Sequence, residues 1–433
     1  MEQLHFPRYE DYKSSGFDWL GDIPSGWPLQ RLGAVFEARK EKVSDKDFPA
    51  LSVTKSGILP QLDSAAKSDD GDNRKGVRTG DFVINSRSDR KGSSGIAKQD
   101  GSVSLINIVL KPKGIDPQYC EHLLKSNGFI EEFYRNGHGI VADLWTTKYW
   151  DMKSIFIPVP DMATQQRIAN FLDQKTAEID EAIAKKQRLI ELLKEQKAIL
   201  INQAVTKGLN PDAPMRDSGV EWIGEVPEHW DVIQNRRAFT KIEQGHSPAI
   251  NNAVEDNEFS VLKLSAIKQG IFIDGEVKAV PKRNFRKEYQ VRKGDFLLTR
   301  GNTPDLVADI CLVRGDPASI TMMPDLVYRI SYDEEVLDKG FISYFFQSPA
   351  ARAQIKLSAR GSSPTMVKVG QDHIKSWLIP LPPIDEQQGI RDHLDELVAQ
   401  FELPIRSAER QIRNLGEFRD VLISNAVTGK IKL

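Results

Sequence analysis

Two copies of one twelve-residue stretch organise this chain. Residues 16–27 read GFDWLGDIPSGW, and residues 219–230 read GVEWIGEVPEHW. Two glycines, two tryptophans and a proline recur in register, and most of the remaining positions change conservatively. Self-similarity of this kind indicates an internal repeat, and a repeat decides the architecture before any single element does. What matters next is how far the duplication extends.

Three further pairs of matching segments follow in the same order along the chain. They are GDFVINSR at 80–87 with GDFLLTRG at 294–301, KSIFIPVPDMATQQRIANFLD at 153–173 with KSWLIPLPPIDEQQGIRDHLD at 375–395, and LINQAVTKG at 200–208 with LISNAVTGK at 422–430. The separation between partners grows at first and then holds constant, so the insertions lie in the first part of the second copy. Chance similarity between two α/β domains does not explain four blocks in one order.

Each half therefore predicts a variable globular domain followed by a long helix of constrained length. The expected parts are a first globular domain at 1–160, a first spacer helix at 161–207, a second globular domain at 208–383 and a second spacer helix at 384–433. The two helices either pack on each other or lie separately on their own domains. Their length, about three times that of an ordinary globular helix, favours packing on each other.

The helical segments carry their own signals. Residues 162–206 contain no proline or glycine, which predicts one uninterrupted helix. We expect this helix to start at Thr164 and Glu386 to help cap the second one. Pro404 lies inside the second helix, where it removes a hydrogen bond, so we expect a break near Leu403.

Apolar residues recur every seven positions along both helices, which is the pattern of a coiled coil. The predicted packing stripe consists of Leu172, Ile179, Leu193, Leu200, Leu394, Phe401, Leu415 and Leu422. Two such helices can pack antiparallel about a pseudo-two-fold axis and offer two similar surfaces to two copies of one partner.

Composition excludes several classes of protein. The net charge is −2, from 59 basic and 61 acidic residues, so overall charge does not indicate a nucleic-acid partner. No apolar run is long enough for a membrane span and no signal-peptide pattern is visible, so we expect a cytoplasmic protein. The two cysteines are isolated and the histidines lack ligand spacing, so no metal site is expected.

Motifs for catalysis are also missing from the sequence. There is no GxxxxGK[ST] loop, because Val77 stands where the lysine of GDNRKGV would be needed. No GxSxG, HExxH or dinucleotide-binding pattern occurs, and neither does the [DNS]PP[YFW] motif of adenine methyltransferases. We therefore expect no catalytic residues.

Local sequence indicates nucleic acid better than net charge does. Two kinds of segment combine basic residues, hydroxyl groups and glycines: the stretches after each Gly-Asp-Phe strand and those before each Pro-rich strand. A third segment, 281–293, holds six basic residues against one acidic residue, with Phe285 and Tyr289 between them. Arginine can read guanine, asparagine can read adenine, and serine or threonine can hold phosphate. A solvated loop is the alternative for each residue. The candidate DNA-binding residues are Arg87, Arg90, Lys91, Ser93, Ser94, Thr146, Lys148, Lys282, Arg283, Arg300, Asn302, Thr303, Ser362, Ser363 and Lys368.

The order of these motifs resembles the specificity subunit of a type I restriction–modification system. The resemblance rests on the doubled G-[FV]-[DE]-W-[LI]-G-[DE]-[IV]-P-x-x-W, the G-D-F strands, the [IV]-P-[LV]-P segments with Q-Q-x-I, and the helices that end in A-V-T. It covers essentially the whole chain. It implies an α+β fold with two tandem target recognition domains, separated by two long antiparallel coiled-coil-like spacer helices with pseudo-two-fold symmetry.

The resemblance also implies partners. Such a subunit binds double-stranded DNA and carries two methyltransferase (M) subunits and two restriction (R) subunits, with no membrane. It would bind no cofactor itself, since S-adenosylmethionine, ATP and Mg²⁺ would belong to the partner subunits. The expected function is to read a bipartite, asymmetric DNA site and to scaffold the adenine methyltransferase and the ATP-dependent restriction subunits.

Two other functions stay open at this point. A structural coiled-coil adaptor would use the helices without touching DNA. A self-sufficient DNA-modifying enzyme would need the catalytic motifs that the sequence lacks.

Overall fold

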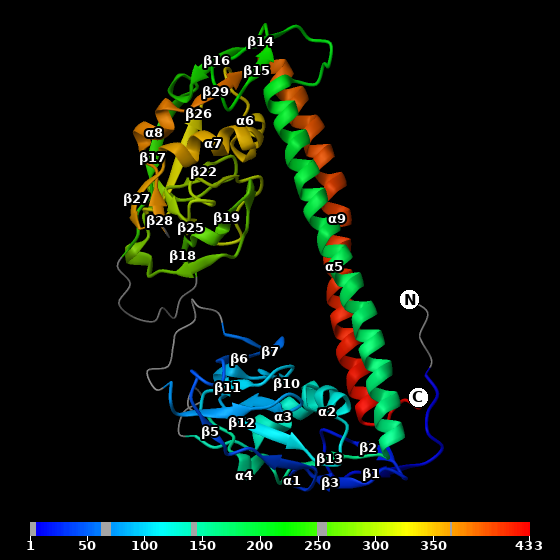
Figure 1. Ribbon diagram of the computed structural model, residues 1–433. Helices are drawn as coiled ribbons and strands as arrows, with labels where there is room; N and C mark the ends of the chain where they lie inside the picture. Colours follow the sequence, from blue (N-terminus) through cyan, green and yellow to red (C-terminus); the bar gives the residue numbers. More distant parts are fainter. Residues whose placement is uncertain (1–5, 62–70, 140–144, 249–257, 364–365) are drawn as a thin grey trace. The chain divides into compact units, whose positions relative to one another are not determined.

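The computed structural model divides into two compact units, drawn in Figure 1. The first unit is Met1–Gln187 with Glu409–Leu433, and the second is Arg188–Ala408. The structure describes residues 6–61, 71–139, 145–248, 258–363 and 366–433. Within these ranges, no helix combines the length and apolar character needed to cross a bilayer.

Two long helices, α5 (Met162–Lys207) and α9 (Ile384–Val427), contribute residues to both units. Helix α9 runs without a break through Pro404, so the expected interruption near Leu403 is wrong. Leu403 and Pro404 are exposed and Ile405 is buried. Water can therefore satisfy the carbonyl group that proline leaves without a partner, while packing of the neighbouring residues holds the helix.

The starts of these helices differ from the expectation in detail. Asp161, not Thr164, caps α5: its carboxylate accepts from the Thr164 backbone N–H at 3.0 Å and from the Thr164 hydroxyl at 2.6 Å. Glu386 pairs with His229 of the second opening segment, Nε2 to Oε2 at 2.8 Å. Glu386 thus forms an ion pair with His229, whereas the sequence predicted a capping role for it.

The helices α5 and α9 pack against each other antiparallel, as expected. In the first unit Arg419 Nη1 lies 2.6 Å from Asp180 Oδ1, and in the second unit Lys197 Nζ lies 2.8 Å from Glu402 Oε1. The residue number of the partner on α9 therefore decreases as the residue number on α5 increases, which is the order of an antiparallel pair. Within each unit the pair of helix segments behaves as the predicted coiled coil.

The predicted packing stripe follows the contact between these helices. Its buried members are Leu172, Ile179, Leu394 and Leu422, and its half-buried members are Leu193, Leu200, Phe401 and Leu415. The contact also buries residues outside the stripe, namely Ile190, Ile201, Ile405 and Ala408. A coiled-coil contact uses two positions of every seven, so one stripe describes about half of it.

The first unit is built on a four-stranded antiparallel sheet. Its strands, in spatial order, are β10 (Ser94–Ile96), β9 (Phe82–Asn85), β12 (Asn107–Pro112) and β4 (Phe36–Ala38). The smaller sheets are β11 (Gly101–Val103), β8 (Arg74–Val77) and β5 (Lys42–Val43); β6 (Leu51–Thr54) with β7 (Gly57–Pro60); β1 (Tyr12–Ser14) with β2 (Asp22–Pro24); and β3 (Leu29–Arg31) with β13 (Phe156–Pro158).

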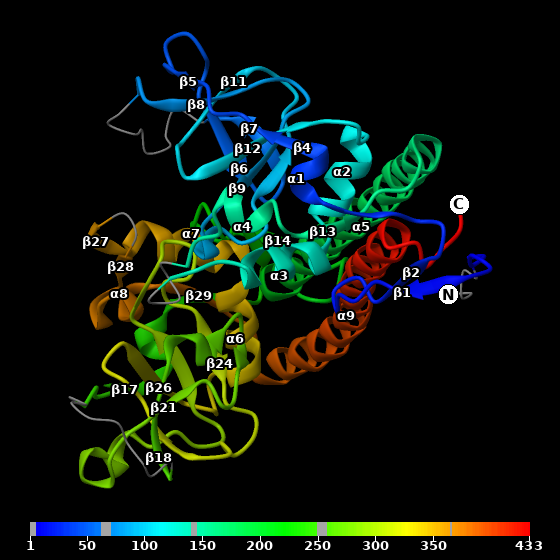
Figure 2. The same ribbon diagram turned by 90° about the horizontal axis from the view of Figure 1, so that it is seen from below.

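Helices cover this sheet and connect it to α5. They are α1 (Leu32–Val35), α2 (Pro117–Leu124), α3 (Asn127–Arg135) and α4 (Tyr149–Met152). Figure 2 shows α2 beside α5, where His122 Nε2 lies 2.7 Å from Asp173 Oδ1. One continuous core joins sheet, helices and the first part of α5.

The second unit repeats this architecture. Its main antiparallel sheet has the order β24 (Ile310–Leu312), β22 (Phe296–Thr299), β26 (Val327–Tyr332) and β17 (Phe239–Gln244). Around it lie β14 (Met215–Asp217) with β15 (Glu225–Pro227); β16 (Asp231–Gln234) with β29 (Leu378–Leu381); β21 (Val277–Ala279), β18 (Phe259–Leu262) and β25 (Ile320–Met322); β19 (Ile267–Lys268) with β20 (Ile271–Phe272); and β23 (Gly301–Asn302), β28 (Met366–Lys368) and β27 (Arg360–Ser363). Its helices are α6 (Lys339–Gln347), α7 (Pro349–Ser358) and α8 (Gln371–Ser376).

The first glutamine of each Q-Q pair locks a long helix to its globular domain. In the first unit Gln165 Oε1 accepts from the Asp116 backbone N–H at 2.8 Å. In the second unit Gln387 Oε1 accepts from the Asp338 backbone N–H, also at 2.8 Å. Asp116 and Asp338 in turn cap α2 and α6. Both glutamines are buried, so the same polar clamp sets the orientation of each long helix on its domain.

The two opening segments pack on helix ends. Each long helix is followed by a left-handed glycine, Gly208 at φ +74° and Gly429 at φ +71°. Gly208 lies against Trp230, and Gly429 against Trp27. Trp27 and Trp230 are therefore core residues that join a domain to a helix end.

Candidate nucleic-acid interface

Two of the predicted loops meet in the first unit. Arg87 faces Thr146 in an isolated antiparallel bridge. The Thr147 backbone N–H donates to the Ser86 carbonyl oxygen at 3.0 Å. The stretch after the Gly-Asp-Phe strand and the stretch before the Pro-rich strand thus form one surface.

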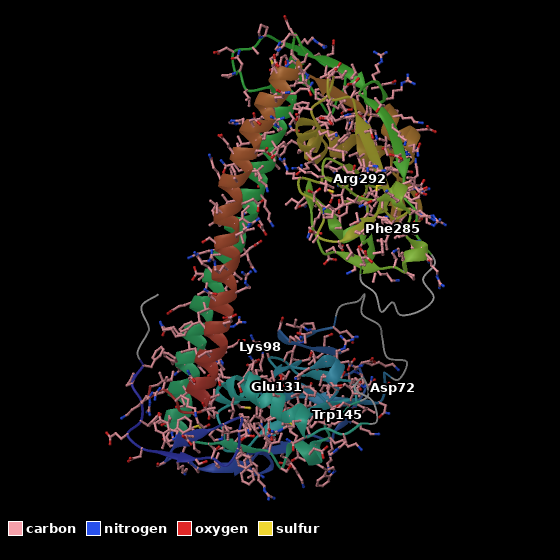
Figure 3. All side chains as sticks on the ribbon, turned by 180° about the vertical axis from the view of Figure 1, so that it is seen from behind. Asp72, Lys98, Glu131, Trp145, Phe285 and Arg292 are labelled. Carbon is pink, nitrogen blue, oxygen red and sulfur yellow. The ribbon has the colours of Figure 1, made fainter. Side chains whose placement is uncertain are left out.

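Helix α3 supports both loops from beneath. The Tyr134 hydroxyl donates to the Asn85 carbonyl oxygen at 2.9 Å, and Trp145 Nε1, labelled in Figure 3, donates to the Tyr134 carbonyl oxygen at 2.7 Å. Burial raises the pKa of Tyr134 to about 12. The hydroxyl therefore stays a neutral donor at every physiological pH, and the loops rest on a fixed support.

A cavity of about 440 Å³ opens beside the bridge of Arg87 and Thr146. Its basic lining residues are Arg39, Lys40, Lys75, Arg87 and Lys148, and no carboxylate is among the described residues that line it. Arg39 is partly neutralised, since Asp81 accepts from it at 2.6 and 2.9 Å. Burial lowers the pKa of Lys75, whose Nζ donates to the Asn107 carbonyl oxygen at 2.5 Å. This cavity, called here the first basic cavity, favours anions.

The other candidates of the first loop lie elsewhere. Ser93 and Ser94 are buried, Ser94 within β10, so they cannot reach nucleic acid and leave the candidate set. Lys91 Nζ forms an ion pair with Glu131 at 2.6 Å. Arg90 is exposed. The sequence indicated a flexible loop here, but the segment turns back into the sheet after one helical turn.

The second unit also joins its two predicted loops. Strand β23 pairs with β28, and β28 with β27, so Asn302 and Lys368 share one small sheet. The Val369 backbone N–H donates to the Arg300 carbonyl oxygen at 2.9 Å. Ser362 and Ser363 belong to β27, and their side chains lie outside what the structure describes.

Arg300 lies between β22 and β23, next to this sheet. Its side chain is half-buried beside Tyr328, whose pKa is raised by burial while the positive charge of Arg300 opposes that rise. Among the described residues, the buried Nε has no hydrogen-bond partner and no carboxylate pairs with the guanidinium. A positioned and unneutralised guanidinium is suited to binding an acceptor.

The loop after Arg300 is held by α7. Arg352 Nη1 donates to the Val307 carbonyl oxygen at 2.8 Å, and Lys356 pairs with Asp305 at 2.7 Å. Asn302 Oδ1 accepts from the Thr303 backbone N–H at 2.9 Å. One side of the Asn302 amide is therefore already used within the loop, while Thr303 is exposed.

Lys282 and Arg283 are exposed on a short 3-10 helix that follows β21. Lys282 Nζ lies 5.7 Å from the ring centre of Phe259, and Phe285, labelled in Figure 3, packs on the same ring at 5.0 Å. These residues belong to the sheet of β18 and not to the β23–β28–β27 sheet.

Comparison with known proteins finds relatives along nearly the whole chain. No family model matches it. The EcoKI specificity subunit of the type I restriction enzyme of Escherichia coli strain K12 is 22% identical over 440 residues, which cover 95% of this chain and 90% of that protein. The StySPI specificity subunit of Salmonella potsdam is 23% identical over 74% of this chain and 67% of its own length. Over nearly its whole length the chain is similar to type I restriction specificity subunits.

A solved structure supports the fold of this chain. It is described as the structural basis of complex assembly and conformational transition of the type I R-M system, and it matches with a TM-score of 0.67. The match has 15% identity and covers 94% of this chain and 99% of that one. The printed names of the relatives are those of specificity subunits of type I restriction enzymes. They also support a role in DNA recognition.

Several residues of the candidate surface were not predicted from the sequence. Arg39, Lys40, Lys75 and Trp150 line the first basic cavity but come from segments far apart in the chain or lack a motif. Trp150 lies at the end of a loop whose lysine and threonine were predicted. Only the exposure of its ring marks Trp150 as a candidate binding residue, and exposure depends on the tertiary structure.

Proposed function

We propose that this chain reads a bipartite, asymmetric DNA site, with each unit binding one half-site in the major groove. The observation that carries this proposal is the repetition of one fold with two different sets of surface side chains. The first unit offers Arg87 and Lys148 at a basic cavity, and the second offers Arg300 and Lys368 at a small sheet. Because the two units share a fold but carry different surface side chains, we expect the two half-sites to differ in sequence.

Bivalency supplies the physical reason for two readers. One domain contacts a few base pairs, which is too little for selectivity in a genome. Linking two readers in one chain makes the second contact effectively intramolecular, which raises affinity without new contacts. The buried clamps at Gln165 and Gln387 hold each reader to its helix. We therefore expect an unread gap of constant length between the half-sites.

The helices are the proposed scaffold for two methyltransferase subunits, and two restriction subunits complete the complex. S-adenosylmethionine, ATP and Mg²⁺ would be bound by those partners. The described part of this chain holds no cluster of His, Cys, Asp and Glu suited to a metal ion. A cytoplasmic location would give the assembly access to DNA.

Methylome sequencing of cells with and without the gene tests the proposal. One bipartite adenine-methylated motif should disappear when the gene is deleted. Loss of no motif would refute the function. Methylation or cleavage by the purified chain alone would instead favour a self-sufficient enzyme. A complex with the methyltransferase that shows no sequence-selective, salt-sensitive DNA binding would favour a structural adaptor.

Replacing Arg300 with alanine should relax one half-site only. Losing a bidentate contact to a base costs about 1–3 kcal/mol and removes discrimination at that base. Arg300→Lys keeps the charge but not the fork geometry, so it should restore affinity without restoring selectivity. The methylated motif of each variant gives the answer, and an unchanged motif for Arg300→Ala would exclude the residue as a reader.

Lys148→Ala should weaken binding equally on all sequences. An exposed ammonium group that contacts phosphate contributes about one unit to the slope of log affinity against log salt. The control is Lys113→Ala, an exposed lysine at the opposite end of β12 from the first basic cavity. Salt titrations of DNA binding by the methyltransferase complex measure both slopes. Equal slopes for both variants would contradict a phosphate contact at Lys148.

A further inference from the structure

The first basic cavity is lined by both basic and apolar side chains. Beside the basic residues, its lining includes the apolar side chains of Leu105, Ile106 and Trp150. A volume of about 440 Å³ lies within the range of small-molecule sites. A planar apolar group with an attached anion matches such a lining better than a regular phosphate backbone, which has no apolar part to bury.

Trp150 is the exposed tryptophan of this chain. It is 65% exposed, whereas every other tryptophan is buried or half-buried. Lys153 Nζ lies 3.8 Å from the ring centre and covers one face of the indole. Lys153 is not among the residues that line the cavity, while Trp150 is. The ammonium group holds the ring in place, and the Tyr149 ring lies at a tilt with its centre 6.3 Å from that of the indole. Most of the indole surface is exposed, so it is available for stacking.

An apolar turn forms part of the lining of the cavity. Leu105 and Ile106 are 41% and 37% exposed between β11 and β12. The Asn107 backbone N–H donates to the Ser104 carbonyl oxygen at 3.0 Å, and Asn107 Nδ2 donates to the same oxygen at 3.1 Å. Exposed leucine and isoleucine on a rigid turn have the form of the apolar wedges that unstack base steps.

We propose that the first basic cavity takes one unstacked nucleotide of the target DNA. Its base stacks on the exposed indole of Trp150, and the Leu105–Ile106 turn occupies the gap left in the base stack. Lys40 and Lys148 contact the flanking phosphates; none of the ion pairs formed by the described residues involves either lysine. This inference rests on the proposed DNA-reading function and adds the class of ligand that the first unit binds.

The second unit lacks this arrangement. Aligning the matched segments that begin at Lys153 and Lys375 places Asp372 opposite Trp150. Asp372 is exposed and carries no aromatic surface. The unstacked nucleotide should therefore occur in one half-site only, which makes its position in the motif a specific expectation.

The test uses the complex with its methyltransferase subunit and duplexes that carry the methylated motif. Each duplex of the series lacks one base on one strand, opposite a chosen position of a half-site. The base at the chosen position stays in place but has lost its pairing partner. Removing the partner of the unstacked base saves the energy of unpairing. The methylated adenines are left out of this series, because a methyltransferase extrudes its own target base. We expect tighter binding at one other position of one half-site and weaker or equal binding at the rest.

Two variants connect this effect to Trp150. Trp150→Ala should weaken binding of the intact duplex roughly ten- to hundredfold and abolish the gain at the special position, since base–aromatic stacking is lost. Trp150→Phe should keep the gain and most of the affinity. Because Trp150 is exposed, both variants should fold, which circular dichroism verifies.

The outcomes separate the inference from the proposed function. Selective binding of intact duplexes with no position of tighter binding would overturn the unstacked nucleotide and leave the DNA-reading function standing. Wild-type affinity for Trp150→Ala would do the same. Absence of any sequence-selective binding by the wild-type complex would overturn both.

Discussion

Replacing Gln387 with alanine should lower the free energy of unfolding of the second unit by roughly 3 kcal/mol. The buried amide makes three hydrogen bonds. Its Oε1 accepts from the Asp338 backbone N–H at 2.8 Å, and its Nε2 donates to the carbonyl oxygens of Pro382 and Val336 at 2.8 and 3.0 Å. Alanine would leave these backbone groups unpaired, and each unpaired buried group costs about 1–3 kcal/mol.

The neighbouring residue provides a matched control. Gln388 carries the same side chain one position later but is exposed, so Gln388→Ala should change stability by less than about 0.5 kcal/mol. Denaturant unfolding compares the two variants. Hydrogen exchange should show faster exchange around Asp338 in Gln387→Ala only. Equal stability of the two variants would mean that the clamp does not hold the helix to its domain.

Leu394→Ala should destabilise the second unit by about 3 kcal/mol, because it opens a cavity at a fully buried position. Leu394 belongs to the core that joins α9 to the second globular domain. The control is Leu403→Ala, which removes the same atoms from the same helix at a position 73% exposed. That change should stay within about 0.5 kcal/mol.

The two leucines also test the arrangement of the helices. Denaturant midpoints of both variants decide the comparison. If Leu403→Ala were the more damaging change, the buried and exposed faces of α9 would be reversed from those of the structure. Loss of DNA binding by Leu394→Ala at a temperature where it remains folded would further indicate that the reader needs a firmly seated helix.

The long helices and the duplication were readable because their signals are local and periodic. A seven-residue apolar repeat and the absence of proline and glycine from 162–206 require no knowledge of distant contacts. The effect of Pro404 was predicted wrongly because it depends on tertiary contacts. The sequence shows that proline removes one helical hydrogen bond. Whether the helix continues depends on packing at Ile405 and exposure at Leu403, which the sequence does not show.

The candidate surface was readable only in part. Proximity of the loops around Arg87 and Thr146 was not predicted, although both loops were. Ser93 and Ser94 were wrongly included, because a run of small polar residues indicates a loop whether or not its side chains face solvent. Trp150 was passed over, since most tryptophans are core residues and the doubled Trp27 and Trp230 are indeed buried.

The sequence by itself determined that the chain has two similar halves and that each half ends in a long helix. It also showed that the segment GFDWLGDIPSGW at 16–27, which opens the first domain, recurs as GVEWIGEVPEHW at 219–230 and opens the second. These features follow from the order and spacing of residues along the chain. Tertiary structure alone decided that the last tryptophan of each opening segment seats on a helix end, that Gln165 and Gln387 are clamps, and that five basic side chains surround a cavity beside Trp150. The physical reason is that burial and charge density depend on which distant segments meet in space.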